Sequence, residues 1–155
     1  MLKRTKSIIA LSVISATPTL FAQEAGRIQA GQFDLIPSFT SSMAYVDNVA
    51  NARDNQSKIY SWRTTLSPEL IAATQVNGNP VQIGYRLERG VYFSSSNDDY
   101  TDHFVEASGD FELNSRHRVS ALAQYEDGHE DRGTGFSIGT GLDISTPDTY
   151  KSSNL

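Results

Sequence analysis

The 155-residue chain contains no cysteine, which excludes a disulfide-stapled scaffold and a thiolate metal site. It also lacks an excess of basic residues: 13 lysines and arginines stand against 18 acidic residues, so the composition does not favour nucleic-acid binding. The apolar run near the N-terminus is shorter than the roughly 20 residues that a membrane-spanning helix needs, and no other run is comparable. A bundle of transmembrane helices is therefore excluded, and a soluble β domain or a membrane β-barrel remains.

Residues 1–22 predict a secretory signal peptide. Three basic residues precede an apolar run from Ser7 to Ala16, and a run of about ten residues suits a signal but is short for a membrane anchor. Cleavage is expected after Ala22, and a buried core helix is the alternative interpretation. Cleavage removes three of the 13 basic residues and none of the 18 acidic ones, so the net charge of 23–155 becomes −8. This charge argues against a basic protein of the membrane surface.

After the predicted signal, apolar and polar residues alternate with period two, and helical spacing is not sustained. Successive side chains of a β-strand point to opposite faces, so this alternation predicts strands with one apolar and one polar face. Five segments show it most clearly: 33–45, 59–73, 81–93, 103–113 and 118–127. Residues 136–145 also alternate and would form a sixth strand or a hairpin within a loop.

Charged residues concentrate on the polar face of these segments. We expect this face to line a barrel lumen with eight charged side chains: Arg63, Glu69, Arg86, Glu88, Glu106, Asp110, Glu112 and Glu126. Arg89, and His103 when protonated, place charge on the apolar face. An arginine facing lipid costs about 2–4 kcal/mol at the bilayer midplane and little near its surface. Arg89 would therefore extend toward the headgroups, unless a bulge at Gly90 reverses the faces.

The connections between the predicted segments alternate in length. Short polar turns are expected at 77–80 and 114–117, the first with the Asn-Gly pair that strongly favours a hairpin. Longer polar connections are expected at 46–58, 94–102 and 128–150. Short turns at one end and long loops at the other are typical of outer-membrane β-barrels, in which the short turns face the periplasm.

Aromatic residues gather where the predicted strands meet the long loops. Rings that carry a polar group favour the membrane–water interface, so we expect an interfacial girdle of Tyr45, Tyr60, Trp62, Phe93 and Tyr125. Tyr92 and Tyr100 occupy the same predicted edge and are assigned to the girdle as well. Ordinary strand packing is the alternative, because aromatic residues favour strands in any case.

Together these patterns predict an all-β fold, an antiparallel up-and-down transmembrane β-barrel of which this chain supplies only about five to six strands, fewer than the roughly eight of the smallest bacterial barrels. An open sheet edge in lipid would leave backbone groups unpaired. We therefore expect 23–155 to be the N-terminal portion of a larger outer-membrane barrel, a fragment produced by truncation. Closure by oligomerisation is the alternative.

Several stretches, in their order along the chain, resemble one family: Ile36–Thr40, Tyr45–Val49, Ser67–Leu70, Gly84–Arg86, Asp99–His103 and Tyr125–Gly133. They are similar to the start of outer-membrane β-barrel porins often associated with exopolysaccharide or capsule loci in Gram-negative bacteria. The resemblance covers about 33–150. It implies an outer-membrane location, a barrel architecture, and a long outer loop after Gly133 that is followed by further strands.

We expect no catalytic, cofactor or metal site, and hence no enzyme. The acidic groups at 98–102 and 126–131 would offer oxygen ligands to calcium, but neither has the glycine-punctuated loop of a typical calcium site. The three histidines would suit a hydrolase only beside a nucleophilic serine, and no nucleophile-elbow motif occurs.

The leading hypothesis is a porin-like barrel that passes small or oligomeric solutes and is linked to polysaccharide export. Its expected partners are outer-membrane lipid, the barrel-assembly machinery and the polysaccharide or small solute, with no nucleic acid. Two alternatives stay open. One is a structural or adhesive surface barrel that acts through its outer loops, and the other is a secreted soluble β-sandwich that binds carbohydrate through its tyrosines.

Overall fold

The computed structural model describes residues 26–135 and 144–155. The predicted signal peptide, 1–22, and most of the possible strand at 136–145 lie outside these residues; 144 and 145 themselves are not in a strand. Helices of the length and apolar character needed to cross a membrane are absent from the described ranges.

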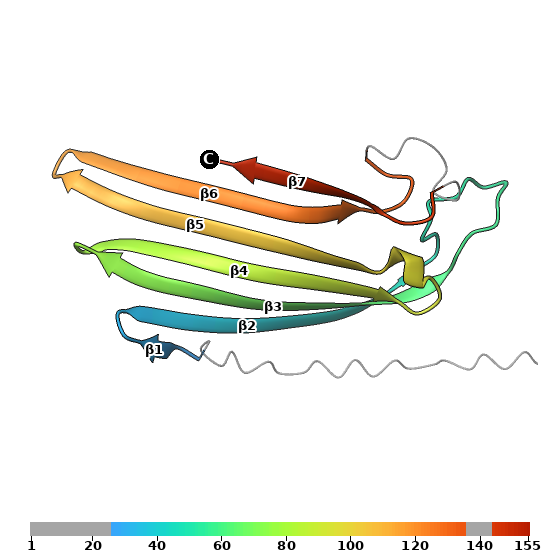
Figure 1. Ribbon diagram of the computed structural model, residues 1–155, viewed down its shortest axis with the longest axis horizontal. Helices are drawn as coiled ribbons and strands as arrows, with labels where there is room; N and C mark the ends of the chain where they lie inside the picture. The colour runs from blue at the N-terminus through green and yellow to red at the C-terminus, as the bar shows by residue number, and fades with distance from the viewer. Residues whose placement is uncertain (1–25, 136–143) are drawn as a thin grey trace, which may run out of the picture.

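Seven antiparallel strands form one sheet in sequence order, which confirms the predicted all-β, up-and-down architecture (Figure 1). The strands are β1 (Ile28–Ala30), β2 (Phe33–Val46), β3 (Ser61–Val76), β4 (Asn79–Tyr92), β5 (Tyr100–Asn114), β6 (His117–Glu130) and β7 (Asp148–Asn154). A 3-10 turn, η1 (Ser96–Asp98), lies between β4 and β5. The sheet is open, with β1 and β7 at its edges, as expected of an incomplete barrel.

The five predicted segments correspond to β2, β3, β4, β5 and β6, but the total of five to six strands was too low. β1 is a short strand that pairs with the start of β2 around a turn at Gly31. β7 begins inside the region expected to be the loop 128–150 and continues to Asn154, and β6 extends into the same region as far as Glu130. The sequence of β7, Asp-Thr-Tyr-Lys-Ser-Ser-Asn, has only one large apolar residue, so apolar–polar alternation does not reveal it.

Both predicted short turns are present, and they lie at the same end of the sheet (Figure 1). The β3–β4 hairpin turns at Asn77 and Gly78, whose φ angles of 52° and 81° suit the type I′ turn that Asn-Gly favours. In the β5–β6 turn, the Asn114 Oδ1 atom accepts a hydrogen bond from the backbone N–H of Arg116 at 3.0 Å. The long connections all lie at the opposite end, called here the long-loop end.

Neighbouring strands are displaced along one another in a constant direction. β5 passes Gly109, which is opposite Val81, and continues to Asn114, so the β5–β6 turn projects beyond the β3–β4 turn (Figure 1). At the long-loop end, β4 stops at Tyr92, opposite Arg63, which lies inside the start of β3. A sheet needs such a stagger if it is to close into a barrel of tilted strands.

The pairing register gives the sheet two chemically different faces. Leu70, Tyr85, Val105 and Tyr125 lie side by side on one face, called the apolar face. The next residues along β3 to β6 form a row of Glu69, Arg86, Phe104 and Glu126 on the opposite, polar face. The large side chains of the apolar face are exposed, and an exposed apolar surface of this size marks a contact with lipid or another apolar surface.

Buried apolar side chains are few in the described part of the chain, and they all lie at the long-loop end. They are Val49, Ala50, Ala52, Tyr92 and Tyr100. The structure therefore buries its small core at one end of the polar face and leaves the apolar face uncovered.

Candidate functional site

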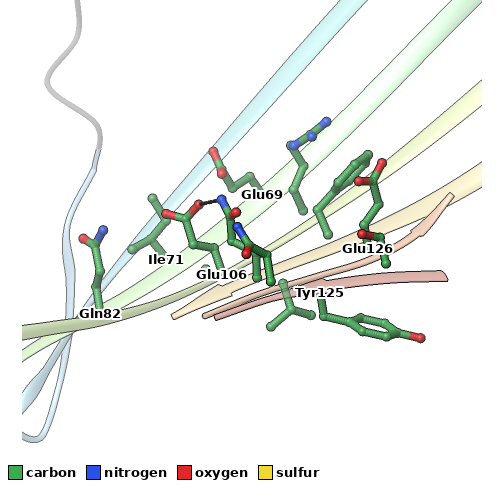
Figure 2. Close-up of a pocket in the computed structure, with 13 residues that line it drawn as sticks. Glu69, Ile71, Gln82, Glu106, Tyr125 and Glu126 are labelled. Atoms are coloured by element: carbon green, nitrogen blue, oxygen red, sulfur yellow. Dashed lines mark hydrogen bonds between the residues drawn. The ribbon is translucent and has the colours of Figure 1, made fainter. Parts of the chain in front are cut away.

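A groove crosses the middle of the polar face over β3 to β7. Its lining includes Glu69, Arg86, Glu106 and Glu126, together with the amide and hydroxyl groups of Gln82, Gln124, Ser152 and Asn154. Figure 2 shows Glu69, Glu106 and Glu126 on one side of the sheet, whereas the ring of Tyr125 points to the other side. The groove is thus built by residues that recur on alternate positions of neighbouring strands.

Three carboxylates of the groove are held by neutral donors. The Ser38 hydroxyl donates to Glu69 at 2.9 Å, and the Gln124 amide donates to Glu106 at 3.0 Å. The Tyr150 hydroxyl donates to Glu126 at 2.6 Å. None of these three carboxylates has an ion pair with a described residue, so they are oriented without losing their charge.

The positive charge in the groove is neutralised. The Arg86 guanidinium lies over the Phe104 ring, 3.8 Å from its centroid, and Nη1 donates to Glu88 at 2.9 Å. Glu88 also accepts hydrogen bonds from the hydroxyls of Ser67 and Tyr100. The Arg86–Glu88 pair contributes no net charge, so the groove as a whole is negative.

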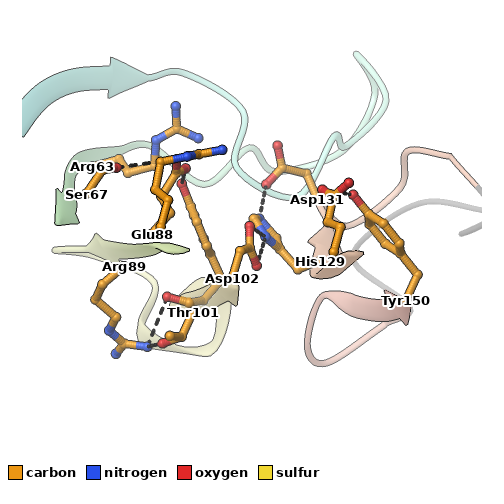
Figure 3. Close-up of polar contacts among 12 residues, drawn as sticks. Arg63, Ser67, Glu88, Arg89, Thr101, Asp102, His129, Asp131 and Tyr150 are labelled. Atoms are coloured by element: carbon orange, nitrogen blue, oxygen red, sulfur yellow. Dashed lines mark hydrogen bonds and ion pairs between the residues drawn. The ribbon is translucent and has the colours of Figure 1, made fainter. Parts of the chain in front are cut away.

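A second polar network lies nearer the long-loop end (Figure 3). The His129 Nδ1 atom lies 2.9 Å from both carboxylate oxygens of Asp102, and Nε2 lies 3.5 Å from Asp131. The Tyr92 hydroxyl donates to Asp131 at 3.5 Å and accepts from Arg63 at 3.2 Å. Asp131 follows β6, and the hydrogen bond from His129 lowers the pKa of its carboxyl below the ordinary value. This network connects β3, β4, β5 and β6.

The first long loop, 47–60, lies against this network, and we call it the cap. Val49 packs with Tyr92 and Tyr100, and Ala50 and Ala52 are buried as well. The Asn51 amide of the cap donates to the backbone oxygen of Gly133, beyond the end of β6, at 2.7 Å. The cap therefore reaches from β2 and β3 across the polar face to the far side of the sheet.

A buried ion pair ties the other two long connections together. Arg132 donates through Nε and Nη2 to the two carboxylate oxygens of Asp98, each at 2.5 Å. Its Nη1 donates to the backbone oxygen of Ile144 at 3.0 Å. Both side chains are almost fully buried, so η1 is fastened to the chain that follows β6. This pair is not evident from the sequence, because Asp98 and Arg132 are far apart along the chain.

The eight charged residues predicted for the lumen all lie on the polar face, according to the strand register. They are Arg63, Glu69, Arg86, Glu88, Glu106, Asp110, Glu112 and Glu126. Two of them lie toward the short-turn end, where Asp110 accepts from the Ser120 hydroxyl and Glu112 pairs with Arg118 at 3.6 Å. Whether this face lines a lumen stays a prediction.

The predicted interfacial aromatics are exposed on the apolar face or beside its end. Tyr45 and Trp62 are paired across β2 and β3 with an edge contact between their rings, and the backbone N–H of Phe93 donates to the Trp62 oxygen. Tyr60 immediately precedes β3. Tyr125 does not end its strand as expected, because β6 continues to Glu130.

The assignment of Tyr92 and Tyr100 to the girdle was wrong. Both face the polar side and are buried, at 3% and 6% exposure, in the cluster beneath the cap. Their position in the alternation already indicates this, since Tyr92 is in phase with Glu88 on β4. The ring of Tyr100 occupies the space beside Gly90, where any side chain would overlap it.

Arg89 remains on the apolar face, because Gly90 keeps the regular register and forms no bulge. The Arg89 guanidinium pairs with Asp99 at 3.2 Å and donates to the Thr101 hydroxyl at 3.1 Å (Figure 3). Its charge is thus neutralised by the β4–β5 connection.

The acidic residues at 98–102 are used separately. Asp98 pairs with Arg132, Asp99 with Arg89, and Asp102 with His129. Within the described ranges, no three histidine or acidic side chains are placed to hold a metal ion together.

A staggered up-and-down sheet with an exposed apolar face and a charged, grooved face defines a porin-like β-barrel protein. The family model described as "Putative beta-barrel porin 2" matches residues 22–154, and the chain belongs to this family. A porin family points to an outer-membrane location. No curated protein and no solved structure matches the chain.

Proposed function

We propose that this chain forms part of the wall of an outer-membrane pore whose interior is the polar face. The observation that carries the proposal is the division of the sheet into an uncovered apolar face and a grooved face with charged side chains. Lipid would cover the apolar face, and strands that pair with the edges at β1 and β7 would complete the wall. Water and solutes would then contact the groove.

We further infer that a signal peptide, cleaved after Ala22, delivers the chain to the periplasm and the assembly machinery. The family match begins at residue 22, which agrees with this boundary. With a periplasmic N-terminus, β2 rises outward, and the short turns at 77–78 and 115–116 face the periplasm. The long connections then lie on the outer side, as is usual for bacterial barrels.

The solutes that fit the groove best are cations. Glu69, Glu106 and Glu126 have neutral hydrogen-bond donors and no ion pair with a described residue, whereas Arg86 is neutralised by Glu88. A row of fixed negative charge raises the local concentration of cations and lowers that of anions. This supports a pore with a preference for cations.

We also propose a link to exopolysaccharide or capsule export, which the sequence resemblance implies. The amides of Gln82, Gln124 and Asn154 in the groove would supply hydrogen bonds to sugar hydroxyls. Neutral oligosaccharides therefore belong among the solutes to test, with block of the ionic current as the readout.

Planar-bilayer recording of the completed barrel, in which further strands pair with β1 and β7, tests the proposal. We expect a conducting pore whose reversal potential in a potassium chloride gradient indicates cation preference. The triple variant Glu69→Gln, Glu106→Gln, Glu126→Gln should lose most of that preference, because the removed charges lack counter-ions. Absence of conductance in the wild-type protein would overturn the proposed pore.

A matched control exists on β6 itself. Asp127 is adjacent to Glu126 but lies on the apolar face, where it pairs with Lys151 at 3.4 Å. Asp127→Asn removes the same charge as Glu126→Gln and should leave the reversal potential unchanged. An equal effect of the two single variants would show that the groove does not set the selectivity.

A further inference from the structure

We propose that the cap, 47–60, is folded into the mouth of the pore and forms its constriction, instead of extending from the cell surface as an outer loop of this length would. That the loop lies in a pore depends on the proposed function, but its position on the polar face is supported by separate observations. It assigns the size limit of the pore to the connection between β2 and β3.

The first observation is burial within a polar loop. Val49, Ala50 and Ala52 are 5%, 0% and 5% exposed, whereas large side chains across the apolar face of the sheet are open. Burial of apolar side chains stabilises a conformation by about 25 cal/mol for each Å² removed from water. The cap is thus held by the small apolar core of the described chain.

The second observation is the surface on which the cap rests. Tyr92 and Tyr100 belong to the polar face, and their hydroxyls form hydrogen bonds with Arg63 and Glu88, respectively. The Tyr100 ring also stacks on the His129 ring, with centroids 3.6 Å apart. The apolar contact with the cap therefore lies on the face that we assign to the pore interior.

The third observation is that the cap bridges the sheet. The Asn48 side chain closes a local ring by accepting from the Ala52 N–H and donating to the Ala52 oxygen, both at 2.8 Å. The backbone N–H of Val49 donates to the Ile59 oxygen, which draws the two arms of the loop together. Asn51 then reaches Gly133 at the far side of the sheet. Figure 1 shows the loop extending over the long-loop end toward the end of β6.

Cysteine labelling tests the position of the cap, because the protein has no natural cysteine. We compare Ala50→Cys, at a buried position, with Asn55→Cys, at an exposed position of the same loop. With a bulky membrane-impermeant maleimide on intact cells, Asn55→Cys should react many-fold faster than Ala50→Cys. Equal rates would overturn the proposal.

Asn51→Gly provides a variant that keeps the fold. Glycine accepts the positive φ of 47° at this position and removes only the amide that binds Gly133. In the Ala50→Cys background it should accelerate labelling several-fold, because the cap loses its attachment to the far side of the sheet. Unchanged labelling would contradict the bridging role.

Single-channel recording tests the constriction. Replacing 49–57 by a short glycine–serine linker should increase the conductance several-fold and admit larger polyethylene glycols. If the wild-type and the shortened protein conduct equally, the cap is not the constriction. If neither protein conducts while Ala50→Cys still reacts slowly with the maleimide, the proposed pore and its constriction are wrong. The inward position of the cap is then still supported.

Discussion

Charged side chains have different partners on the two faces of the sheet. On the apolar face, Arg89 pairs with Asp99 and Lys151 pairs with Asp127. On the polar face, the carboxylates of the groove have neutral hydrogen-bond donors. This difference suits a sheet between lipid and water, because an unpaired charge is expensive in lipid and is hydrated in a water-filled pore.

The buried pair of Asp98 and Arg132 makes a prediction at the same scale. Asp98→Asn leaves the Arg132 guanidinium buried without a counter-charge, and removal of one partner of a buried pair costs about 3–5 kcal/mol. Backbone amides of η1 and of the chain after β6 should then exchange hydrogen much faster, as measured by mass spectrometry on the protein in vesicles.

The control for this variant is Asp54→Asn in the cap. Asp54 pairs with Lys58 at 3.0 Å, but the Asp54 side chain is exposed, so the loss of this pair should leave exchange at η1 unchanged. Slow exchange at η1 in Asp98→Asn would show that the ion pair does not fasten the two connections.

Among the elements, the β3–β4 hairpin depends most on one backbone conformation. Gly78 has a φ of 81°, which alanine adopts only with strain, so Gly78→Ala should lower the free energy of unfolding by about 1 kcal/mol. Gly84→Ala is the matched variant, because its added methyl group would meet Ile71 at an ordinary 3.5 Å. Urea unfolding from vesicles, followed by the fluorescence of Trp62, measures the difference. Equal stabilities would contradict the type I′ assignment.

The elements that the sequence predicts are those with a strong period-two pattern. β2 to β6 alternate over ten or more residues, and the Asn-Gly pair marks a turn by its own backbone preference. β1 and β7 form because they pair with a neighbouring strand. The sequence of a short polar segment such as Asp148–Asn154 does not predict this pairing. The cap was missed for a similar reason, since Val49 becomes buried through contacts with residues far away in the sequence, Tyr92 and Tyr100.

In the molecule as a whole, the border of the apolar face nearest the long-loop end runs obliquely across the strands. It reaches the long-loop end at Tyr45 and Trp62 on β2 and β3. On β6 it stops at Tyr125, opposite Val105, and the next residue on that face is Asp127. Strands that tilt relative to the membrane meet its flat surface at different positions along their lengths. Tyr125 can therefore lie at the membrane–water interface although it lies inside its strand.

Fluorescence quenching by brominated lipids tests this border, because Trp62 is the single tryptophan. Bromine near the headgroups should quench Trp62 more strongly than bromine deep in the acyl chains. In a Trp62→Phe background, Tyr125→Trp should show the same shallow preference, and Ile83→Trp should show the deep one. If deep bromine quenches Tyr125→Trp more strongly than shallow bromine, the border follows the pairing register of the strands and not an oblique line.

The sequence-ordered pairing of the strands also affects how the protein is built. No strand among those described crosses over another to find its partner, so every strand of the sheet pairs with a strand that is its neighbour in the sequence. Pairing between sequence neighbours favours the addition of one strand at a time, because each new strand closes only the connection to the strand before it. If the strands add in chain order, we expect a lesion in one hairpin to halt the hairpins that follow it and to spare those that precede it.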